Sequence, residues 1–335
     1  MGYLNVSSMA RKEQVKKIVI VLNSAWQGYN FRMNLARELK KNNYEVLFFA
    51  PEDNNYSNKI RREFFFVNIN FNAKGINPLD DLKTSYSLFR AFKKNKPDIV
   101  LNFTIKPNIF SAVVARLLRI HSINNITGLG TVFIKKTFIT AIVKLLYKIS
   151  LACSTHTFFQ NSDDRNLFIN NNLISKDKCN LIPGSGVDTN FFLPVIRDSD
   201  TFRFLMVSRL IKDKGLHEFI DAAKITKKNG VEFWILGESN SENLTAISKK
   251  DISRLSQNGV VKFFDKTDDV KSFLNKVDCV VLPSYREGSP RSILEASSSC
   301  IPVIVTNVTG CRDVVDNNIT GLYCRVKDAK DLASK

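Results

Sequence analysis

The 335-residue sequence is poor in the residues from which most metal and acid–base sites are built. It contains three histidines and six cysteines, and no two cysteines have CxxC spacing. No His, Cys or Asp residues have metal-ligand spacing, and the one DxD triplet, Asp198-Ser199-Asp200, lies in an irregular segment instead of directly after a strand. We therefore expect no metal and no cofactor, and we interpret the scattered cysteines as free thiols in a reducing compartment.

The chain also lacks a long uninterrupted hydrophobic run. Its first apolar run, Ile18 to Leu22, is shorter than the roughly 7 to 15 residues of a signal-peptide core, so we expect a cytoplasmic protein. Residues 131–153 form a longer apolar stretch, but four lysines interrupt it. Such a segment is too charged to span a bilayer and is suited to lying on one. The alternative interpretation, a core-facing helix whose lysines extend to solvent, remains open.

Acidic residues are scarce in the first half of the chain. The net charge is +17; residues 1–190 carry 27 Lys+Arg against 13 Asp+Glu, whereas residues 191–335 carry 22 against 19. A basic half fits nucleic acid, an anionic membrane or a phosphorylated ligand, or is merely a solvated face. The aromatic residues fall mostly in apolar runs and no nucleic-acid module signature is present, so we expect no nucleic-acid partner.

Short apolar runs alternate with longer amphipathic stretches, which is the βαβ pattern of a parallel sheet, and the pattern occurs twice. The sequence therefore predicts an α/β fold with two doubly wound, Rossmann-like domains, 1–190 and 191–335, joined through an irregular Gly-, Pro- and Asp-rich linker at 182–200. The expected strands are 17–22, 44–50, 98–103, 122–126, 202–208, 231–236, 260–264, 279–283 and 302–306. The expected helices are 31–42, 78–95, 107–119, 131–153, 214–229, 241–257, 268–276 and 290–299.

Ligands of open α/β sheets bind beyond the carboxyl ends of the strands, so two such domains predict a site in a cleft that both face. A dinucleotide-dependent enzyme is excluded, because no GxGxxG follows the first strand, which continues into NSAWQGYNF.

The segment from Val280 to Thr306, VVLPSYREGSPRSILEASSSCIPVIVT, carries the strongest signal for chemistry. After the strand, Glu287 and Gly288 predict a turn, Ser289 is a good helix N-cap, and a proline follows at the first helical position. The free N–H groups of the first turn, from Ser289 through Arg291 to Ser292, would form an anion site suited to a diphosphate.

Two carboxylates flank this expected diphosphate site. Side chains on a helix lean toward its N-terminus, so Glu295 can point back at a ligand held there. Glu287 would lie beside negatively charged phosphates, and hydrogen bonding to sugar hydroxyls is the role that fits it. Glu295 would then bind a ribose.

A second segment, FLMVSRLIKDKGLHEFIDAAK at 204–224, places two cations after a strand. The strand is expected to end at Ser208, and Arg209 and Lys214 lie in the loop before the next helix. Such a pair of cations would stabilise negative charge that develops on a leaving group held at the expected anion site. We therefore expect Arg209, Lys214 and Glu287 to be the catalytic residues.

The EGSPRSILE segment resembles the E-x7-E motif of retaining GT-B glycosyltransferases, in particular family 4, which builds polysaccharides and lipid-linked glycans. SRLIKDKG resembles that family's R-L-x-x-x-K-G segment, although the family more often has Gly where this chain has Ser208. VKFFDKTDDVKSFLNKVDCVVLPS resembles the strand and loop that line the nucleotide base, which makes Lys266 a candidate. The resemblance implies a retaining, metal-independent transfer of a hexose or N-acetylhexosamine from a nucleotide sugar, with UDP as the family's usual nucleotide.

The first half, through SAWQGYNFRMNLARELKKNNYEV and INNITGLGTVF, resembles transferases of surface polysaccharide, capsule and lipopolysaccharide synthesis. We expect Phe31 and Arg32, at the start of the first helix, to lie on the acceptor side. Lys106, Asn108, Thr127 and Gly128 are expected on the same side, at later strand ends. Many relatives have His where this chain has Thr127, which weakens any assignment of a histidine base. The resemblance implies a polyprenyl-diphosphate-linked or other glycan acceptor, and a protein bound peripherally to the inner face of the cell membrane.

Two rival functions remain open at this point. A nucleotide-sugar epimerase shares the two-domain architecture, but the chain has none of the His-rich equipment that favours proton abstraction. A basic nucleic-acid-binding protein is the rival from a different class.

Overall fold

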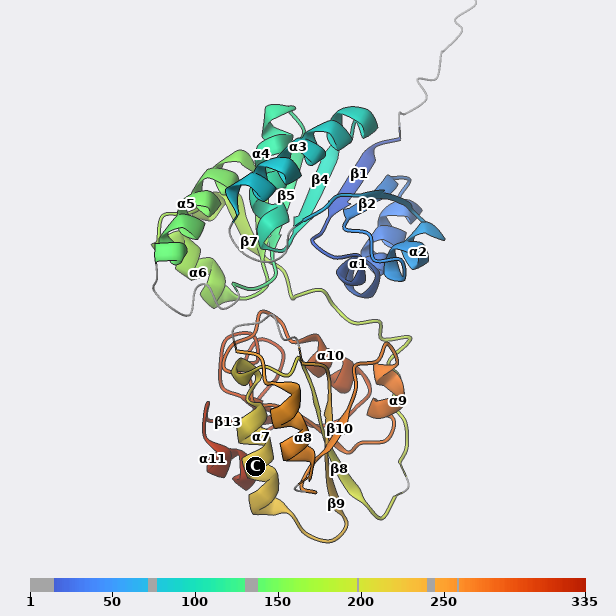
Figure 1. Ribbon diagram of the computed structural model, residues 1–335, viewed down its shortest axis with the longest axis vertical. Helices are drawn as coiled ribbons and strands as arrows, with labels where there is room; N and C mark the ends of the chain where they lie inside the picture. Colours follow the sequence, from blue (N-terminus) through green and yellow to red (C-terminus); the bar gives the residue numbers. More distant parts are fainter. Residues whose placement is uncertain (1–14, 72–76, 130–137, 198, 240–244, 258) are drawn as a thin grey trace, which may run out of the picture. The chain divides into compact units, whose positions relative to one another are not determined.

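The computed structural model describes residues 15–71, 77–129, 138–197, 199–239, 245–257 and 259–335 (Figure 1). The described residues of 1–126 and 137–157 form one compact unit, and those of 127–136 and 158–335 form a second. Each unit is described separately below.

The first sheet has seven strands in the order β3-β2-β1-β4-β5-β6-β7, and every pair whose register is defined is parallel. Its strands are β1 (Lys17–Val21), β2 (Glu45–Ala50), β3 (Phe65–Asn68), β4 (Ile99–Phe103), β5 (His121–Ile126), β6 (His156–Phe159) and β7 (Cys179–Leu181). The helices are α1 (Ala25–Lys41), α2 (Tyr56–Arg61), α3 (Pro78–Asn95), α4 (Ala112–Leu117), α5 (Phe138–Cys153) and α6 (Ser162–Asn170), with a π-helical turn, η1 (Pro107–Ser111), before α4. The chain passes from the first unit to the second within β6.

Alternating side chains of the central strand β1 explain why helices cover both faces of this sheet. Val19 and Val21 pack into a core with α3 and α4, whereas Ile20 and Leu22 pack into a separate core with α1 and α2. Successive side chains of a strand point to opposite faces, so a continuous apolar strand needs a helical layer on each. Figure 1 shows α3, α4 and α5 as one such layer.

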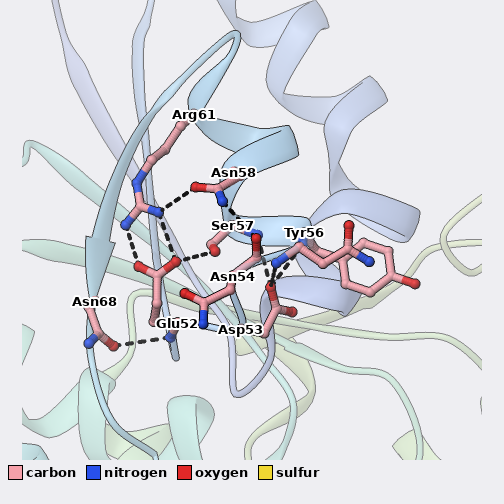
Figure 2. A network of polar contacts seen from close by, with 9 residues as sticks. Glu52, Asp53, Asn54, Tyr56, Ser57, Asn58, Arg61 and Asn68 are labelled. Atoms are coloured by element: carbon pink, nitrogen blue, oxygen red, sulfur yellow. Dashed lines mark hydrogen bonds and ion pairs between the residues drawn. The ribbon is translucent and has the colours of Figure 1, made fainter.

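A polar cluster orders the loop after β2 (Figure 2). The guanidinium of Arg61 binds the carboxylate of Glu52, with one N–H···O distance of 2.7 Å, and Ser57 donates a hydrogen bond to the same carboxylate. Asp53 accepts hydrogen bonds from the backbone N–H groups of Tyr56 and Ser57 at 2.8 and 3.0 Å. Glu52 therefore attaches the strand end to α2, while Asp53 satisfies the first N–H groups of that helix.

The second sheet has six strands in the order β10-β9-β8-β11-β12-β13. They are β8 (Phe202–Val207), β9 (Val231–Leu236), β10 (Lys262–Phe264), β11 (Cys279–Leu282), β12 (Val303–Thr306) and β13 (Gly321–Cys324), and the helices are α7 (Leu216–Thr226), α8 (Lys249–Gln257), α9 (Val270–Leu274), α10 (Arg291–Ser298) and α11 (Ala329–Ser334). Two apolar cores lie on its two faces, one with α7 and the other with α10. The predicted α/β fold with two doubly wound parallel sheets is confirmed.

Several predicted elements differ in their bounds. The first helix begins at Ala25 and not at residue 31, while 78–95 and 231–236 are found as predicted. Residues 131–137 of the predicted helix 131–153, residues 241–244 of the predicted helix 241–257, and Asp198 of the DxD triplet lie outside the described residues. The described residues of 182–200 form neither helix nor strand, while the domain boundary at 190 stays a prediction.

Candidate functional site

The candidate donor site lies at the carboxyl edge of the second sheet. Strands β10, β9, β8 and β11 are neighbours in that order, so the loops that follow them lie side by side. Lys266 follows β10, Arg209 follows β8 and Glu287 follows β11. Lys266 forms a partly exposed ion pair with Glu238, in the loop after β9, at 3.7 Å. The sheet order therefore brings together segments that are far apart in the sequence.

The centre of the site is an ion pair between Lys214 and Glu287, with 2.5 Å between Nζ and Oε1. Both side chains are largely buried. Lys214 ends a short 3-10 turn, η4 (Lys212–Lys214), directly before α7. The two residues are 73 positions apart, and the structure pairs the two groups that the sequence assigned to the diphosphate and to the sugar.

Backbone contacts hold the two loops of this pair together. The N–H of Tyr285 donates to the carbonyl of Asp213 at 2.9 Å, and the hydroxyl of Ser284 donates to the same carbonyl at 3.2 Å. Gly215 has a φ of +75°, and a Cβ there would collide with the carbonyl oxygen of Pro283. Only glycine permits both the left-handed backbone and this close approach.

Arg209 is the exposed cation of the site. It follows β8 directly after Ser208, and its guanidinium forms no ion pair with any part of the chain that the structure describes. Ser208 continues the strand pairing through its N–H, which donates to the carbonyl of Leu236 at 3.1 Å, and its hydroxyl lies against the carbonyl of Arg209. Strand β8 ends at Val207, one residue earlier than predicted.

Glu295 lies on α10 and is buried, with 8% of its surface exposed. Its carboxylate pairs with the guanidinium of Arg291, one helical turn earlier, at 2.8 Å. Burial raises the pKa of the Glu295 carboxyl above its ordinary value, and Arg291 opposes that rise. A buried carboxylate with one cationic partner retains capacity to accept hydrogen bonds from a ligand.

The predicted N-cap of this helix is wrong. Helix α10 begins at Arg291, and Pro290 occupies the N-cap position with ψ of 107°. Because this ψ is extended, Pro290 cannot be the first helical residue, and Ser289 lies one residue outside the cap. The hydroxyl of Ser289 is buried and has no hydrogen-bond partner among the described residues. Ser292 lies in the first turn of α10, as expected.

Gly288 lies where two segments approach closely. A Cβ at Gly288 would collide with the carbonyl oxygen of Thr127 and come within 3.3 Å of the Cα of Gly128. Thr127 and Gly128 belong to the same unit as Gly288. The structure therefore brings these two residues, expected on the acceptor side, against the turn that carries Glu287.

The other expected acceptor-side residues belong to the first unit. Phe31 and Arg32 lie inside α1 and do not begin it, because the helix starts six residues before Phe31. Arg32 is buried, with its guanidinium 4.0 Å from the ring centroid of Phe103. Lys106 pairs with Asp81 at 2.7 Å. Asn108 lies buried in η1 and donates from Nδ2 to the carbonyl of Asn125 at 2.9 Å.

Sequence reasoning missed the residues that support the site. Tyr285 donates its hydroxyl to Glu218 at 2.7 Å, and Asp164 binds Arg286 immediately before Glu287. No spacing in the sequence links these partners, which are 67 and 122 residues apart. Within the described ranges, no three His, Cys, Asp or Glu side chains are grouped so that they could hold a metal ion.

Two family models match the chain and together span most of it. "Glycosyl transferases group 1" matches residues 190–335, and "Glycosyl transferase 4-like" matches residues 17–162. The capsular polysaccharide biosynthesis glycosyltransferase CapM of Staphylococcus aureus is 31% identical over 76% of this chain and 70% of its own length. The chain belongs to the family 4 type of GT-B glycosyltransferases.

Two other relatives of this glycosyltransferase are named for lipid-linked acceptors. An N,N'-diacetylbacillosaminyl-diphospho-undecaprenol alpha-1,3-N-acetylgalactosaminyltransferase of Campylobacter jejuni is 27% identical over 92% of this chain and 85% of its own length. A UDP-Gal:alpha-D-GlcNAc-diphosphoundecaprenol alpha-1,3-galactosyltransferase of Escherichia coli is 28% identical over 80% of this chain and 72% of its own length.

Solved structures confirm the GT-B fold. Anabaena Alr3699/HepE, solved with UDP and glucose, has a TM-score of 0.75 at 17% identity, covering 95% of this chain and 88% of that one. A putative UDP-N-acetylglucosamine 2-epimerase of Listeria monocytogenes has a TM-score of 0.64 at 12% identity, covering 96% and 86%. The epimerase shares the fold, whereas the family matches are to transferases.

Proposed function

We propose that this glycosyltransferase moves a hexose or N-acetylhexosamine, with retention of configuration and without a metal ion, from a UDP-sugar to a lipid-linked glycan of surface polysaccharide synthesis. The observation that carries the proposal is the grouping of Arg209, Lys214, Glu287 and Glu295 at one sheet edge. This grouping offers two cations for a diphosphate and two carboxylates for hydroxyl groups.

The cations would stabilise the leaving group. As the bond between the sugar and the diphosphate breaks, negative charge accumulates on the diphosphate oxygens. Arg209 is exposed and Lys214 lies five residues later in the same loop, so we propose that both bind those oxygens. Glu287 orients Lys214 and would accept hydrogen bonds from the sugar hydroxyls. Glu295 would accept hydrogen bonds from the ribose.

The resemblance to retaining family 4 enzymes supports retention. The ion pairs of Glu287 with Lys214 and of Glu295 with Arg291 fit the hydrogen-bonding roles proposed for both carboxylates, and the proposed reaction uses neither as a nucleophile. In the proposed reaction, the acceptor oxygen attacks the face that the diphosphate leaves. The new glycosidic bond forms as the bond to the diphosphate breaks, and the leaving phosphate oxygen takes the acceptor proton.

The named substrates of the relatives support the donor and acceptor classes. The E. coli relative is named for UDP-Gal, and both it and the C. jejuni relative are named for diphosphoundecaprenol-linked acceptors. The proposed donor contacts are Ser208, Lys266, Gly288, Ser289, Arg291 and Ser292, in addition to the four residues named above. Phe31, Arg32, Lys106, Asn108, Thr127 and Gly128 are the proposed acceptor-side residues.

The membrane-bound acceptor class supports a location on the inner face of the cell membrane. In the part of the chain that the structure describes, no helix is long and apolar enough to cross a bilayer. Because the named relatives have lipid-linked acceptors, we propose peripheral binding for this protein.

Thermal unfolding with a nucleotide panel tests the donor site. We expect UDP to raise the midpoint in the presence of EDTA, because a ligand of the native state stabilises it by mass action. At a UDP concentration of about 100 times Kd the stabilisation is about 2.7 kcal/mol. Glu295→Ala should lose most of this shift, whereas Glu38→Gln, an exposed change on α1, should keep it.

Two outcomes would contradict the proposal. A UDP effect that disappears with EDTA would refute metal-independent binding. If no nucleotide shifts the midpoint while polyanions do, the donor site is wrong and a nucleic-acid or polyanion site takes its place.

A further inference from the structure

The first turn of α6 contacts the backbone on both sides of Glu287. The carboxylate of Asp164, whose side chain is fully buried, pairs with the guanidinium of Arg286. The amide of Asn161 donates a hydrogen bond to the carbonyl of Gly288 at 3.2 Å. One contact thus precedes Glu287 and the other follows it, and all five residues lie in the second unit.

The two α6 residues also hold each other. Oδ1 of Asn161 accepts a hydrogen bond from the N–H of Asp164 at 2.7 Å, and Nδ2 of Asn161 donates to Oδ2 of Asp164 at 3.0 Å. The first bond makes Asn161 the N-cap of α6, and the second ties its side-chain amide to the carboxylate of Asp164. Together the two bonds fix both side chains in the geometry that contacts the Glu287 segment.

A third contact reaches the backbone N–H of Glu287 itself. That N–H donates to the carbonyl of Thr309 at 3.1 Å. The hydroxyl of Thr309 donates to Asp163, on the same turn of α6, and Arg312 pairs with Asp163 at 2.9 Å. Asp163 and Arg312 are both about half exposed, so we expect this contact to contribute less than the buried one.

We propose that Asn161 and Asp164 are positioning residues for Glu287. They hold residues 286–288 so that the Glu287 carboxylate stays against Lys214. The kinetic consequence rests on the proposed function, whereas the placement of Glu287 does not.

The physical reason is the buried charge of Asp164. A buried carboxylate needs a charged, hydrogen-bonding partner, and Arg286 is its charged partner among the described residues. Neutralising Asp164 releases Arg286, whose side chain is 30% exposed and can move into solvent. Residues 286–288 then lose an anchor directly before the carboxylate. A displacement of about 1 Å at a reacting group can cost on the order of a hundredfold in rate.

Acylation of Lys214 measures the placement of Glu287 without any substrate. The full chain is treated with a water-soluble acetylating ester, and the rate at Lys214 is followed by peptide mass spectrometry. In the wild type, the Glu287 carboxylate shields the amine; Glu287→Gln removes that shield and sets the upper limit. We expect Asp164→Asn to raise the rate toward this limit. The matched control is Asp269→Asn, because Asp269 caps α9 through the N–H of Ser272 at 3.1 Å and lies in the same unit.

Steady-state kinetics measure the consequence for transfer. We expect Asp164→Asn to lower kcat by about tenfold to a hundredfold. The UDP-induced rise in unfolding midpoint should remain in large part, because Arg209, Lys214 and Glu295 are unchanged and the proposed contact of Glu287 is with the transferred sugar, which UDP lacks. A variant that was only less stable would have a lower unfolding midpoint. It would not show a reduced kcat together with an unchanged UDP-induced shift. Arg286→Lys is the second variant, and it keeps the buried carboxylate of Asp164. If Asp164→Asn does not fold, Arg286→Lys should show the lower kcat with the UDP-induced shift retained.

Several outcomes decide the proposal. An unchanged Lys214 acylation rate in both Asp164→Asn and Arg286→Lys would overturn it, as would an equal rise in Asp269→Asn. Loss of UDP binding together with kcat would also overturn it. If the wild type binds UDP and transfers no sugar, the proposed function fails, and the acylation rates still decide the placement.

Discussion

The side chain of Glu295 is buried, and its carboxylate is proposed to accept hydrogen bonds from the ligand. Its contribution to protein stability and its contribution to ligand binding depend on pH in opposite directions. Burial raises its pKa above the ordinary glutamate value of 4.5, because the charged form loses hydration. The folded state therefore holds this proton more tightly than the unfolded state does. The resulting contribution to stability is present below the ordinary value and is lost as pH rises through the raised pKa. The proposed binding of the ribose, in contrast, requires the charged carboxylate, which accepts stronger hydrogen bonds.

This contrast predicts the pH dependence of UDP binding. We expect the affinity of the wild type for UDP to fall as pH drops through the raised pKa of Glu295. This fall should occur above pH 4.5, the ordinary pKa of a glutamate. Glu295→Gln should bind UDP more weakly at neutral pH and should lack this dependence. Calorimetric titration of both proteins from about pH 8 to pH 5 measures it. Parallel pH curves for the two proteins would show that Glu295 does not bind the nucleotide in its charged form.

At the scale of elements, the loop after β2 depends on the carboxylate of Glu52 (Figure 2). Hydrogen bonds from Arg61 and Ser57 lower the pKa of Glu52 from 4.5 to about 2, although partial burial acts in the opposite direction. Because this pKa is lowered on folding, the ionised Glu52 stabilises the folded protein above pH 4.5. This stabilisation is lost as pH falls toward the folded-state pKa of about 2.

Replacing this carboxylate should destabilise the first unit in a pH-dependent way. We expect Glu52→Gln to lower the unfolding midpoint by roughly 2 to 4 °C at neutral pH, or about 1 kcal/mol. The difference from the wild type should shrink as pH falls from about 4.5 toward 2, where Glu52 itself becomes protonated. Glu45→Gln is the control, because Glu45 forms an exposed ion pair with Lys17 at 3.3 Å that should contribute little. A difference that stays constant over this pH range would rule out the charge of Glu52 as its cause.

The sequence predicted the long, strongly patterned elements and missed several short ones. Helix 78–95 has a proline at its start, an Asn cap and a clear apolar face, so its bounds were predictable. Strands β3, β6, β7 and β13, of three or four residues each, were missed, although β10, β11 and β12 are as short and lie within predicted apolar runs. The start of α1 was missed because Gly28 and several aromatic residues interrupt the helical spacing of apolar residues in this segment. A Cβ at Gly28 would approach Ile60 at 3.1 Å, so the glycine allows α1 to pack closely on α2.

The candidate site was predictable as residue types and not as contacts. Arg209 and Lys214 lie in the loop after β8, Glu287 lies in the loop after β11, and Glu295 lies on the second turn of α10. Local patterns in the sequence identify such positions. Their partners depend on sheet order, which brings loops from distant parts of the sequence together. Asp164 and Arg286 are 122 residues apart, and no spacing encodes their pairing.

At the scale of the whole molecule, the basic charge is concentrated in the first unit and accompanies exposed apolar side chains. Helices α3, α4 and α5 lie side by side on one face of the first sheet (Figure 1). We call their outer surface the helical face; its exposed large apolar residues are Leu79, Leu82, Tyr86, Leu117, Leu145 and Ile149. Helix α3 carries Lys83, Arg90, Lys93 and Lys94 against Asp80 and Asp81, and residues 101–150 contain seven basic residues and no acidic one.

This helical face predicts binding to anionic membranes. Apolar side chains can enter the headgroup region, while each lysine or arginine near an anionic surface contributes about 1 kcal/mol. We expect the protein to sediment with vesicles that contain anionic phospholipid and to be released as ionic strength rises, because salt screens the charges. Neutral vesicles should bind it weakly.

The variant Leu145→Ser with Ile149→Ser tests the apolar part of this binding. Both side chains are about half exposed on α5, at 59% and 48%, so their replacement should leave folding intact. We expect vesicle affinity to fall by about thirtyfold or more, since each buried apolar side chain contributes on the order of 1 kcal/mol or more and every 1.4 kcal/mol is tenfold. Ile319→Ser, at an 83% exposed position in the second unit, is the control and should bind as the wild type does. Equal losses of affinity in both variants would mean that general surface hydrophobicity drives binding. No loss in either variant would leave charge as the cause of binding. Either result would contradict insertion of the helical face.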